Sequence, residues 1–252
     1  MGSQPDKMEN TSDIGNLGYT PTIQVDSPWD VKQVADKLPG GRPVEGSSSP
    51  LPFFHMIERL KTTKREGWRR FGINQGESIA DHMYRMSIIS MFAPPSLASR
   101  LDLNKCMKMC LIHDMAELLV GDITPRDGVP KHEKSRREAT TMDYLTDDLL
   151  KSVGASGSVG KEIRAIWQEY EDGQTLDSVF VHDVDKMELL LQMSEYENRA
   201  GGKEKLDLSE FAYVAKKLSL PETQQWAEEL LAGRGGATEA DQELDEYYAR
   251  EK

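Results

Sequence analysis

The chain has 252 residues, with 31 Lys and Arg against 43 Asp and Glu, so its formal net charge is −12. This length allows one large domain or two small ones, and it suffices to bury a hydrophobic core without disulfides. Affinity for polymeric nucleic acid comes largely from Lys and Arg that neutralise phosphates. We therefore expect no binding of polymeric nucleic acid and no membrane association.

The first fifty residues are rich in Gly, Ser, Pro and Asp, so 1–50 is predicted to be a largely disordered tail and linker. One short helix is predicted in SPWDVKQVADKL, with Ser27 as its cap and Pro28 at its first position. Residues 232–252 open with glycines and become acidic, which predicts a second flexible tail. No secretory signal or membrane span is visible, so we expect a cytoplasmic protein, with a nuclear location left open.

Between the tails, apolar residues recur at helical spacing, and no segment alternates as a strand would. This pattern predicts a single all-α domain over 51–231. Cys106 and Cys110 lie four residues apart, on one helical face, where two core residues are expected rather than a disulfide. The predicted helices span about 51–65, 77–92, 102–119, 132–151, 160–171, 176–199, 208–217 and 222–231.

Ionisable residues interrupt the apolar faces of three of these helices. His82 lies on the face that also carries Ile79 and Met86. His113 and Glu117 continue the stripe begun by the two cysteines, with Asp114 one step round the helix. In the helix over 176–199, both Asp183 and Asp185 are flanked at helical spacing by apolar residues, and periodicity does not decide between them.

Buried carboxylates are costly unless they pair with positive charge, and the inward positions offer few basic residues. A divalent cation would supply that charge. Imidazole and carboxylate ligands suit Mn, Fe, Co, Ni, Zn or Mg, and no thiolate lies nearby to indicate a structural zinc site. A metal site and a set of hydrogen-bonded core residues are thus both open interpretations.

The order of these residues resembles the HD-domain superfamily of metal-dependent phosphohydrolases. A histidine, an adjacent His-Asp pair and a later aspartate occur here in ADHMYR, IHDMAE and VDKME. The resemblance implies that the metal ligands are His82, His113, Asp114 and Asp185. It favours Asp185 over Asp183 because VDKME matches the Asp-Lys-x-Glu pattern of the superfamily.

Longer motifs resemble one family within this superfamily, the 5′-deoxynucleotidases. The resemblance extends from about residue 51 to about residue 231, and it implies a single HD-domain helical bundle that includes neither tail. It implies catalytic roles for Glu117 and Asp122. In some members of the family these two residues bind a second metal, and here the carbonyl of Ile123 would complete that second site. The motifs that carry the resemblance are ESIADHMYRMSIISM, LIHDMAELLVGDITP, VPKHEKSRRE, IWQEYE and SEYEN.

Glu117 follows the His-Asp pair by one helical turn, near enough to give a proton to a leaving oxygen or to take one from an attacking water. Asp122 could orient Glu117 or join it on a second cation. The residue types do not choose between these roles.

Two basic clusters could bind an anionic substrate. In GWRRFGI, Trp68 could stack on a base or sugar while Arg69 or Arg70 binds phosphate. The family places a tryptophan, often with an arginine, in this region, but Gly67 stands where bacterial relatives have that arginine. In PKHEKSRRE, Lys131 is a candidate substrate contact, although alternating charges of this kind also suit a solvated helix face.

The resemblance implies hydrolysis of deoxyribonucleoside 5′-monophosphates to deoxynucleoside and phosphate. The cofactor would be a divalent cation, with Mn, Co or Mg favoured over Zn, Fe or Ni, and the protein would be a homodimer. Two alternatives remain: hydrolysis of another nucleotide, such as a triphosphate, cyclic nucleotide or alarmone, and a catalytically silent HD binding module. The intact ligand motifs argue against the silent module.

Overall fold

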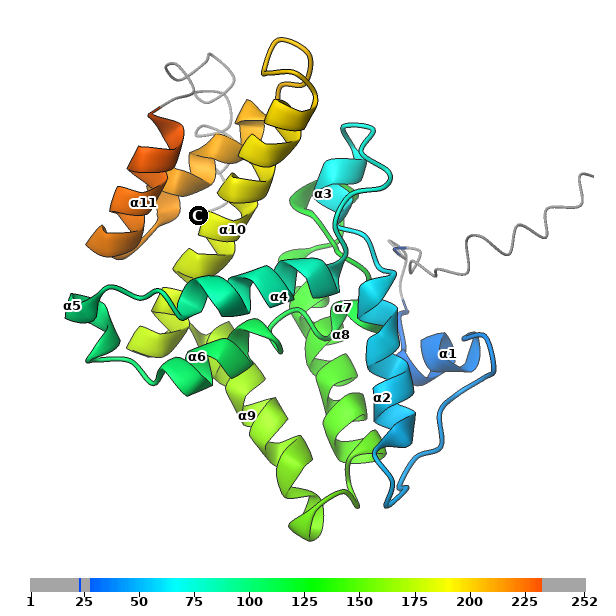
Figure 1. Cartoon of the computed structure of the whole chain (residues 1–252). Coiled ribbons are helices and arrows are strands. Elements are labelled where there is room, and N and C mark those ends of the chain that lie inside the picture. The colour runs from blue at the N-terminus through cyan, green and yellow to red at the C-terminus, as the bar shows by residue number, and fades with distance from the viewer. Residues whose placement is uncertain (1–22, 24–27, 233–252) are drawn as a thin grey trace, which may run out of the picture.

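The computed structural model describes residues 23 and 28–232, and helix α10 (Leu176–Arg199) organises them (Figure 1). Thr175 and Ser178 begin this helix, because the side chain of each accepts the backbone N–H of the other. α10 packs against α4 (Ile79–Ser90), α6 (Leu103–Cys110), α9 (Ser158–Asp172), η5 (Ser209–Lys217) and α11 (Pro221–Leu231).

The remaining helical segments surround this framework. They are α1 (Val31–Asp36), α2 (Leu51–Ile57), α3 (Glu66–Arg69), α5 (Pro95–Ala98), α7 (Glu117–Val120) and α8 (Lys131–Asp143), with short 3₁₀ turns η1 (Glu58–Lys61), η2 (Pro125–Asp127) and η4 (Ala155–Gly157) and a π-helical turn η3 (Tyr144–Leu149). The described residues form no strand, which confirms the all-α prediction. Nor does any helix among them have the length and hydrophobicity needed to cross a membrane.

Helices whose ends carry local signals match their predictions closely. α10 spans the predicted 176–199, and α11 begins one residue early at Pro221. α4 begins after Ser78, whose hydroxyl accepts the N–H of Asp81 while the Asp81 carboxylate accepts the N–H of Ser78. Cys106 and Cys110 are free and buried in the core, as predicted.

The continuous helix predicted over 102–119 is wrong in its middle. α6 ends at Cys110, residues 111–116 form turns, and only Glu117–Val120 is helical again. In a continuous helix the Cys110 carbonyl would accept the N–H of Asp114. Here that carbonyl lies 3.0 Å from Nδ1 of His113, so a side chain replaces a helical partner at this point. Segment 208–217 likewise forms the 3₁₀ helix η5, and the helix predicted over 132–151 ends in η3.

Residues 28–50, predicted mainly as tail and linker, pack against the helical body. The predicted short helix is α1, but its cap is Asp30, whose carboxylate accepts the N–H of Gln33, and Pro28 precedes the helix. Ala35 and Leu38 are buried in the main core. The predicted cap Ser27 and the tail beyond 232 lie outside the described residues.

α9 approaches η3 closely at Gly160. A Cβ at this position would lie 2.5 Å from the backbone oxygen of Thr146 and 3.2 Å from Cβ of Leu150. Thr146 and Leu150 are both buried, so a methyl group added at position 160 has no room.

We predict that Gly160→Ala lowers the free energy of unfolding by about 1–3 kcal/mol, because the Thr146 backbone cannot move without disturbing η3. Urea unfolding followed by circular dichroism measures the change. Gly67→Ala is the matched control, since a Cβ there meets only the Phe211 ring at 3.5 Å. Equal unfolding midpoints for Gly160→Ala and the wild type would contradict the close approach.

Candidate metal centre and active site

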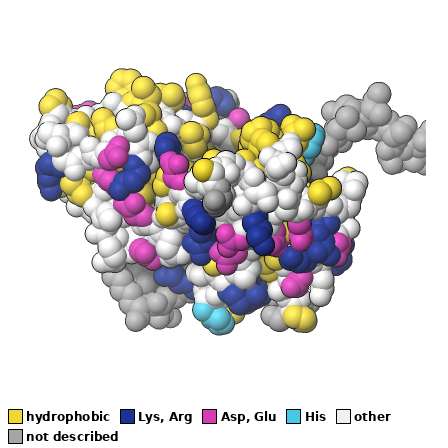
Figure 2. All heavy atoms as spheres, turned by 90° about the horizontal axis from the view of Figure 1, so that it is seen from below, with side chains coloured by type: hydrophobic (Ala, Val, Ile, Leu, Met, Phe, Trp, Pro, Cys, Tyr) yellow, Lys and Arg dark blue, Asp and Glu magenta, His cyan; other side chains and the backbone are white. Residues whose placement is uncertain are grey.

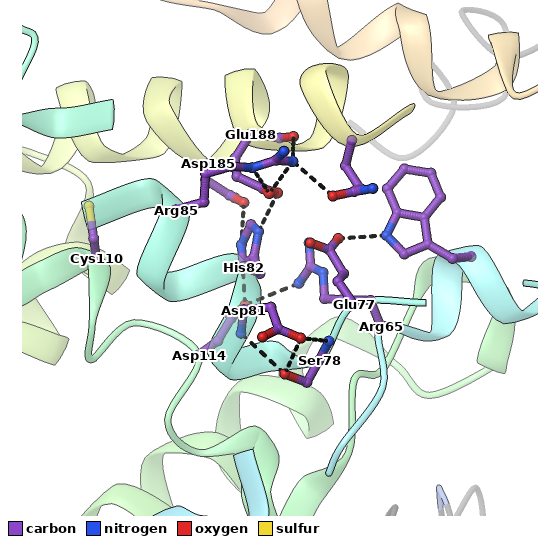
Figure 3. Close-up of polar contacts among 12 residues, drawn as sticks. Arg65, Glu77, Ser78, Asp81, His82, Arg85, Cys110, Asp114, Asp185 and Glu188 are labelled. Carbon is purple, nitrogen blue, oxygen red and sulfur yellow. Dashed lines mark hydrogen bonds and ion pairs between the residues drawn. The ribbon is translucent and has the colours of Figure 1, made fainter. Parts of the chain in front are cut away.

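His82 is a fully buried histidine whose two ring nitrogens face different partners (Figure 3). Its Nδ1 lies 2.6 Å from Oε2 of Glu188, and its Nε2 lies 3.2 Å from Oδ1 of Asp185. Both acidic residues are one turn apart on α10, which packs against α4. The helix pair therefore fixes the ring and points Nε2 at Asp185.

His113 and Asp114 reach the same point from the turns at 111–116. Nδ1 of His113 contacts the Cys110 carbonyl, and its Nε2 lies 3.2 Å from Oδ2 of Asp114. That same Oδ2 is 3.8 Å from Nε2 of His82. Ligand atoms of His82, His113 and Asp185 all lie within 4.8 Å of one another.

This geometry fits a divalent cation. His82 Nε2 and His113 Nε2 are buried and each lies 3.2 Å from a carboxylate oxygen, but neither makes a hydrogen bond with it. The other nitrogen of each ring is engaged by a carboxylate or a backbone carbonyl, which is how proteins usually orient a metal-binding imidazole. The structure thus brings together the four predicted ligands His82, His113, Asp114 and Asp185.

Arg85 holds Glu188 in place behind His82. The Arg85 guanidinium contacts Oε1 of Glu188 at 2.6 Å, and it also binds Glu195 and Gln192. Burial and Arg65 lower the pKa of His82, but Glu188 and Asp185 outweigh them and raise it to about 10. The surrounding carboxylates therefore favour positive charge at this position.

Asp183 and Asp185 have different partners, although they are two residues apart on α10. The buried Asp183 carboxylate accepts the N–H groups of Ser219 and Leu220 and the hydroxyl of Thr223. These groups belong to the start of α11, so Asp183 caps that helix. Only Asp185 is directed toward the histidines, in agreement with the sequence prediction.

Glu117 and Asp122 flank the ligand cluster at either end of α7. Glu117 is 2% exposed, and its Oε2 has no hydrogen-bond partner. Burial raises the pKa of Glu117 well above its usual value, and Asp114 and Asp122 raise it further. Asp122 accepts the N–H of Glu66 at 2.6 Å and thereby ties the start of α3 to the site.

Arg65 contacts this cluster directly, and the sequence analysis missed it. Its Nη1 lies 3.1 Å from Asp114 and 4.0 Å from Asp122. Asp114 is 49 positions away in the chain, so local spacing could not predict the contact. The available cue was the position of Arg65 two residues before Gly67, in the motif that lacks the adjacent arginine.

The cluster opens into a cavity of about 480 Å³. Its acidic end carries the metal-ligand candidates, and another part of its wall is apolar. A third part, from α8, carries Lys131 and Lys134, of which Lys134 lies 3.5 Å from Glu138. The acidic end includes His113, Asp114, Glu117, Asp122, Ile123 and Asp185, and the apolar wall includes Trp68, Leu189, Phe211, Tyr213 and Val214.

The predicted substrate contacts differ in their placement. Trp68 borders the cavity but is only 1% exposed, because its ring packs on Tyr196 and Phe211 and its Nε1 donates to Glu77. It forms part of the wall instead of an open stacking surface. Arg70 and Lys131 line the cavity, whereas Arg69 does not line it and pairs with Glu66.

Fold and site together define an all-α protein with a His and Asp cation site at one end of a cavity. The HD domain family model matches residues 57–226, more than half of the chain, and the chain belongs to this family. The family and the donor set together indicate a divalent metal.

Curated relatives of this chain carry an enzyme name. The chain is 41% identical over 192 residues to the 5′-deoxynucleotidase hdd1 of Schizosaccharomyces pombe, a match covering 75% of this chain and 91% of that protein. It is 36% identical over 189 residues to the 5′-deoxynucleotidase HDDC2 of Homo sapiens, covering 75% and 88%.

Solved structures agree with this assignment. The HD domain-containing protein YGK1 superposes with a TM-score of 0.55 at 33% identity, covering 73% of this chain and 84% of that chain. A conserved hypothetical protein from Pyrococcus furiosus superposes with a TM-score of 0.57 at 26% identity, covering 71% and 98%.

We predict opposite effects for the two α10 aspartates. Asp185→Ala should abolish stoichiometric Mn²⁺ binding while leaving the helical content intact. Asp183→Ala should leave the metal site in place but lower the free energy of unfolding by about 2–4 kcal/mol, because the cap is lost and buried donors become unpaired. Calorimetric Mn²⁺ titration and urea unfolding measure the pair. Full Mn²⁺ affinity in Asp185→Ala would remove that residue from the ligand set.

Proposed function

We propose that this protein is a metal-dependent phosphomonoesterase that hydrolyses deoxyribonucleoside 5′-monophosphates to deoxynucleoside and phosphate. The observation that carries the proposal is a His and Asp cluster with two unpartnered Nε2 atoms at the acidic end of a cavity that also has an apolar wall. Relatives that share 36–41% identity are named 5′-deoxynucleotidases. A nucleotide needs both a charged and an apolar subsite.

A divalent cation held by His82, His113, Asp114 and Asp185 would acidify a water molecule and withdraw charge from the phosphoryl group. Imidazole and carboxylate ligands suit several divalent ions, and among these we favour Mn, Co or Mg, as the resemblance to 5′-deoxynucleotidases implies.

Glu117 is our candidate for proton transfer. It is buried at the acidic end of the cavity, and its Oε2 is unpartnered, so this oxygen is available to give a proton to the leaving 5′ oxygen or to take one from water. The Asp122 carboxylate holds the N–H of Glu66, which supports a positioning role for this residue.

One cation is favoured over two. A second cation would use Glu117, Asp122 and the Ile123 carbonyl. The guanidinium of Arg65, however, already lies between Asp114 and Asp122 and supplies positive charge there. The same charge would also attract the phosphate dianion.

Lys134 would complete the phosphate subsite from the α8 wall. It borders the cavity and contacts Glu138, and the nearby carboxylates of Glu138 and Glu117 offset burial and raise its pKa above the usual value. We therefore assign a phosphate contact to Lys134, with Lys131 and Arg70 nearer the edge. The nucleoside would lie against Phe211 and Tyr213 of η5.

Further features support the remaining parts of the proposal. Tyr84, Ile88, Met91 and Phe92 are exposed on α4 and the turn after it, and this apolar surface supports a homodimer. Lys and Arg are interspersed with Asp and Glu on the face in Figure 2, as suits a protein that binds small nucleotides and no polymeric nucleic acid. We also propose a cytoplasmic location and a catalytic domain over 51–231.

A phosphate-release panel tests the reaction. After chelation, we expect no release from any substrate, and added Mn²⁺, Co²⁺ or Mg²⁺ should restore release from deoxyribonucleoside monophosphates above release from ribonucleotides, triphosphates and cyclic nucleotides. Asp114→Ala is the inactive control. Preferred hydrolysis of a triphosphate, cyclic nucleotide or alarmone would assign the site to another reaction, and no release with any ion would leave a binding module.

Lys134→Met tests the phosphate subsite. Loss of one charge-assisted hydrogen bond should raise KM for a deoxyribonucleoside monophosphate about 10- to 100-fold, with a smaller change in Mn²⁺ affinity. Lys108→Met is the control, because Lys108 is exposed and pairs with Glu162 on the surface. An unchanged KM in Lys134→Met would exclude this contact.

A further inference from the structure

Trp29 packs the segment before α1 against residues 120–123, which follow Glu117. It lies outside the HD domain match, which begins at residue 57, and yet it is only 5% exposed. Its buried partners form a small separate cluster, Val120 and Ile123, with Val31, Val34 and Val129 packed around it. An aromatic side chain therefore covers the outer side of the segment that follows Glu117.

That segment contributes to the catalytic cavity on its inner side. Asp122 and Ile123 both line the cavity, and Gly121 adopts a φ of 82°, a conformation that leaves the helix sharply. The segment is held from the inside by the bond from Glu66 N–H to Asp122. On its other side, Val120 and Ile123 pack on Trp29.

Trp29 also contacts α8, which forms the cationic wall. The guanidinium of Arg136 donates to the Trp29 carbonyl at 3.0 Å, and that of Arg137 lies 5.8 Å from the centre of the Trp29 ring. Lys131 and Lys134 of the same helix line the cavity. α1 itself packs against both α7 and α8. The Trp29 side chain thus packs on Val120 and Ile123 and faces Arg137 of α8, while its backbone carbonyl binds Arg136 of the same helix.

Ion pairs anchor the rest of this segment. Arg42 binds both carboxylate oxygens of Asp36, and Lys32 pairs with Glu45 and with Asp148 of η3. The Gly46 N–H donates to the Asp148 carbonyl. Each such exposed ion pair contributes little to the free energy of folding. They nevertheless fix the path of the chain on both sides of α1, together with the buried Ala35 and Leu38.

We infer that Trp29 is a positioning residue for catalysis. Its side chain sets the distance between the Glu117–Ile123 segment and the Lys134 wall, and so aligns the proton-transfer and phosphate-binding groups. The metal ligands His82, His113, Asp114 and Asp185 lie outside the Trp29 cluster, so the residue acts on turnover and not on metal affinity. This role rests on the proposed function for its kinetic consequence.

Trp29→Leu tests the inference while retaining an apolar side chain, and Trp29→Phe is the conservative variant. In the full chain, Trp29→Leu should lower kcat about 10- to 100-fold, as expected when catalytic groups shift slightly, while Mn²⁺ affinity changes less than about threefold. Amide hydrogen exchange over 120–130 should become at least about tenfold faster. Trp29→Phe should restore most of both properties.

Trp226→Leu is the control on a second tryptophan, because the half-buried Trp226 packs with α10, η5 and α11 and does not line the cavity. It should destabilise the fold without changing exchange over 120–130 or kcat per folded molecule. Wild-type kcat and exchange in Trp29→Leu would overturn the inference, as would equal effects in the control. If Trp29→Leu does not fold, Trp29→Met, which also keeps an apolar side chain but removes the ring, replaces it in the same comparison, and wild-type kcat and exchange in that variant would overturn the inference.

Exchange and Mn²⁺ binding need no substrate, so they separate this inference from the proposed function. A wild-type protein that releases no phosphate but shows faster exchange over 120–130 in Trp29→Leu would overturn the reaction and retain the structural coupling. An active wild type whose Trp29 variants keep wild-type kcat and exchange would support the reaction and overturn the role of Trp29.

Discussion

The site depends on one electrostatic constraint: two buried imidazoles and several carboxylates converge within a few ångströms. Taking such groups out of water is costly unless each has a partner of opposite charge or a hydrogen bond. The protein satisfies the outer atoms itself, through Glu188 behind His82 and the Cys110 carbonyl behind His113. The two inner Nε2 atoms are left for an ion, and this is why the cluster reads as a metal centre and not as a core hydrogen-bond network.

The same constraint explains irregular features of the backbone. Residues 111–116 leave the helical path where the Cys110 carbonyl meets the His113 ring, and this places His113 beside His82. α10 serves two purposes along its length, because Asp185 and Glu188 face α4 while Asp183 caps α11. The first feature interrupts a helix, and the contact between the His113 ring and the Cys110 carbonyl compensates for it. The second places carboxylates in the interior, where they accept hydrogen bonds from neighbouring elements.

The spacing of apolar residues along the chain predicted the positions of single helices. Periodicity located α10 and α4 to within a few residues, and in the structure Thr175 and Ser78 cap their first turns. The break at 111–116 depends on a side chain turning inward, and the contact of Arg65 with Asp114 depends on the tertiary fold, so neither is visible in spacing. Trp68 illustrates the same limit: beside two arginines it suggested a stacking surface, but Tyr196 and Phe211 enclose it.

The net charge of −12 is distributed unevenly, and several of its carboxylates lie at the cavity. At the cavity, the carboxylates of Asp114, Asp122 and Glu117 are partly offset by Arg65 and Lys134, which place positive charge beside the acidic end. A bound cation adds to that local field without changing the acidic exterior. A polyanion would meet the excess negative charge of the whole chain, whereas a nucleotide small enough for the cavity would mainly meet the groups that line it. We therefore expect the acidity of the chain to favour small anionic substrates over polyanions.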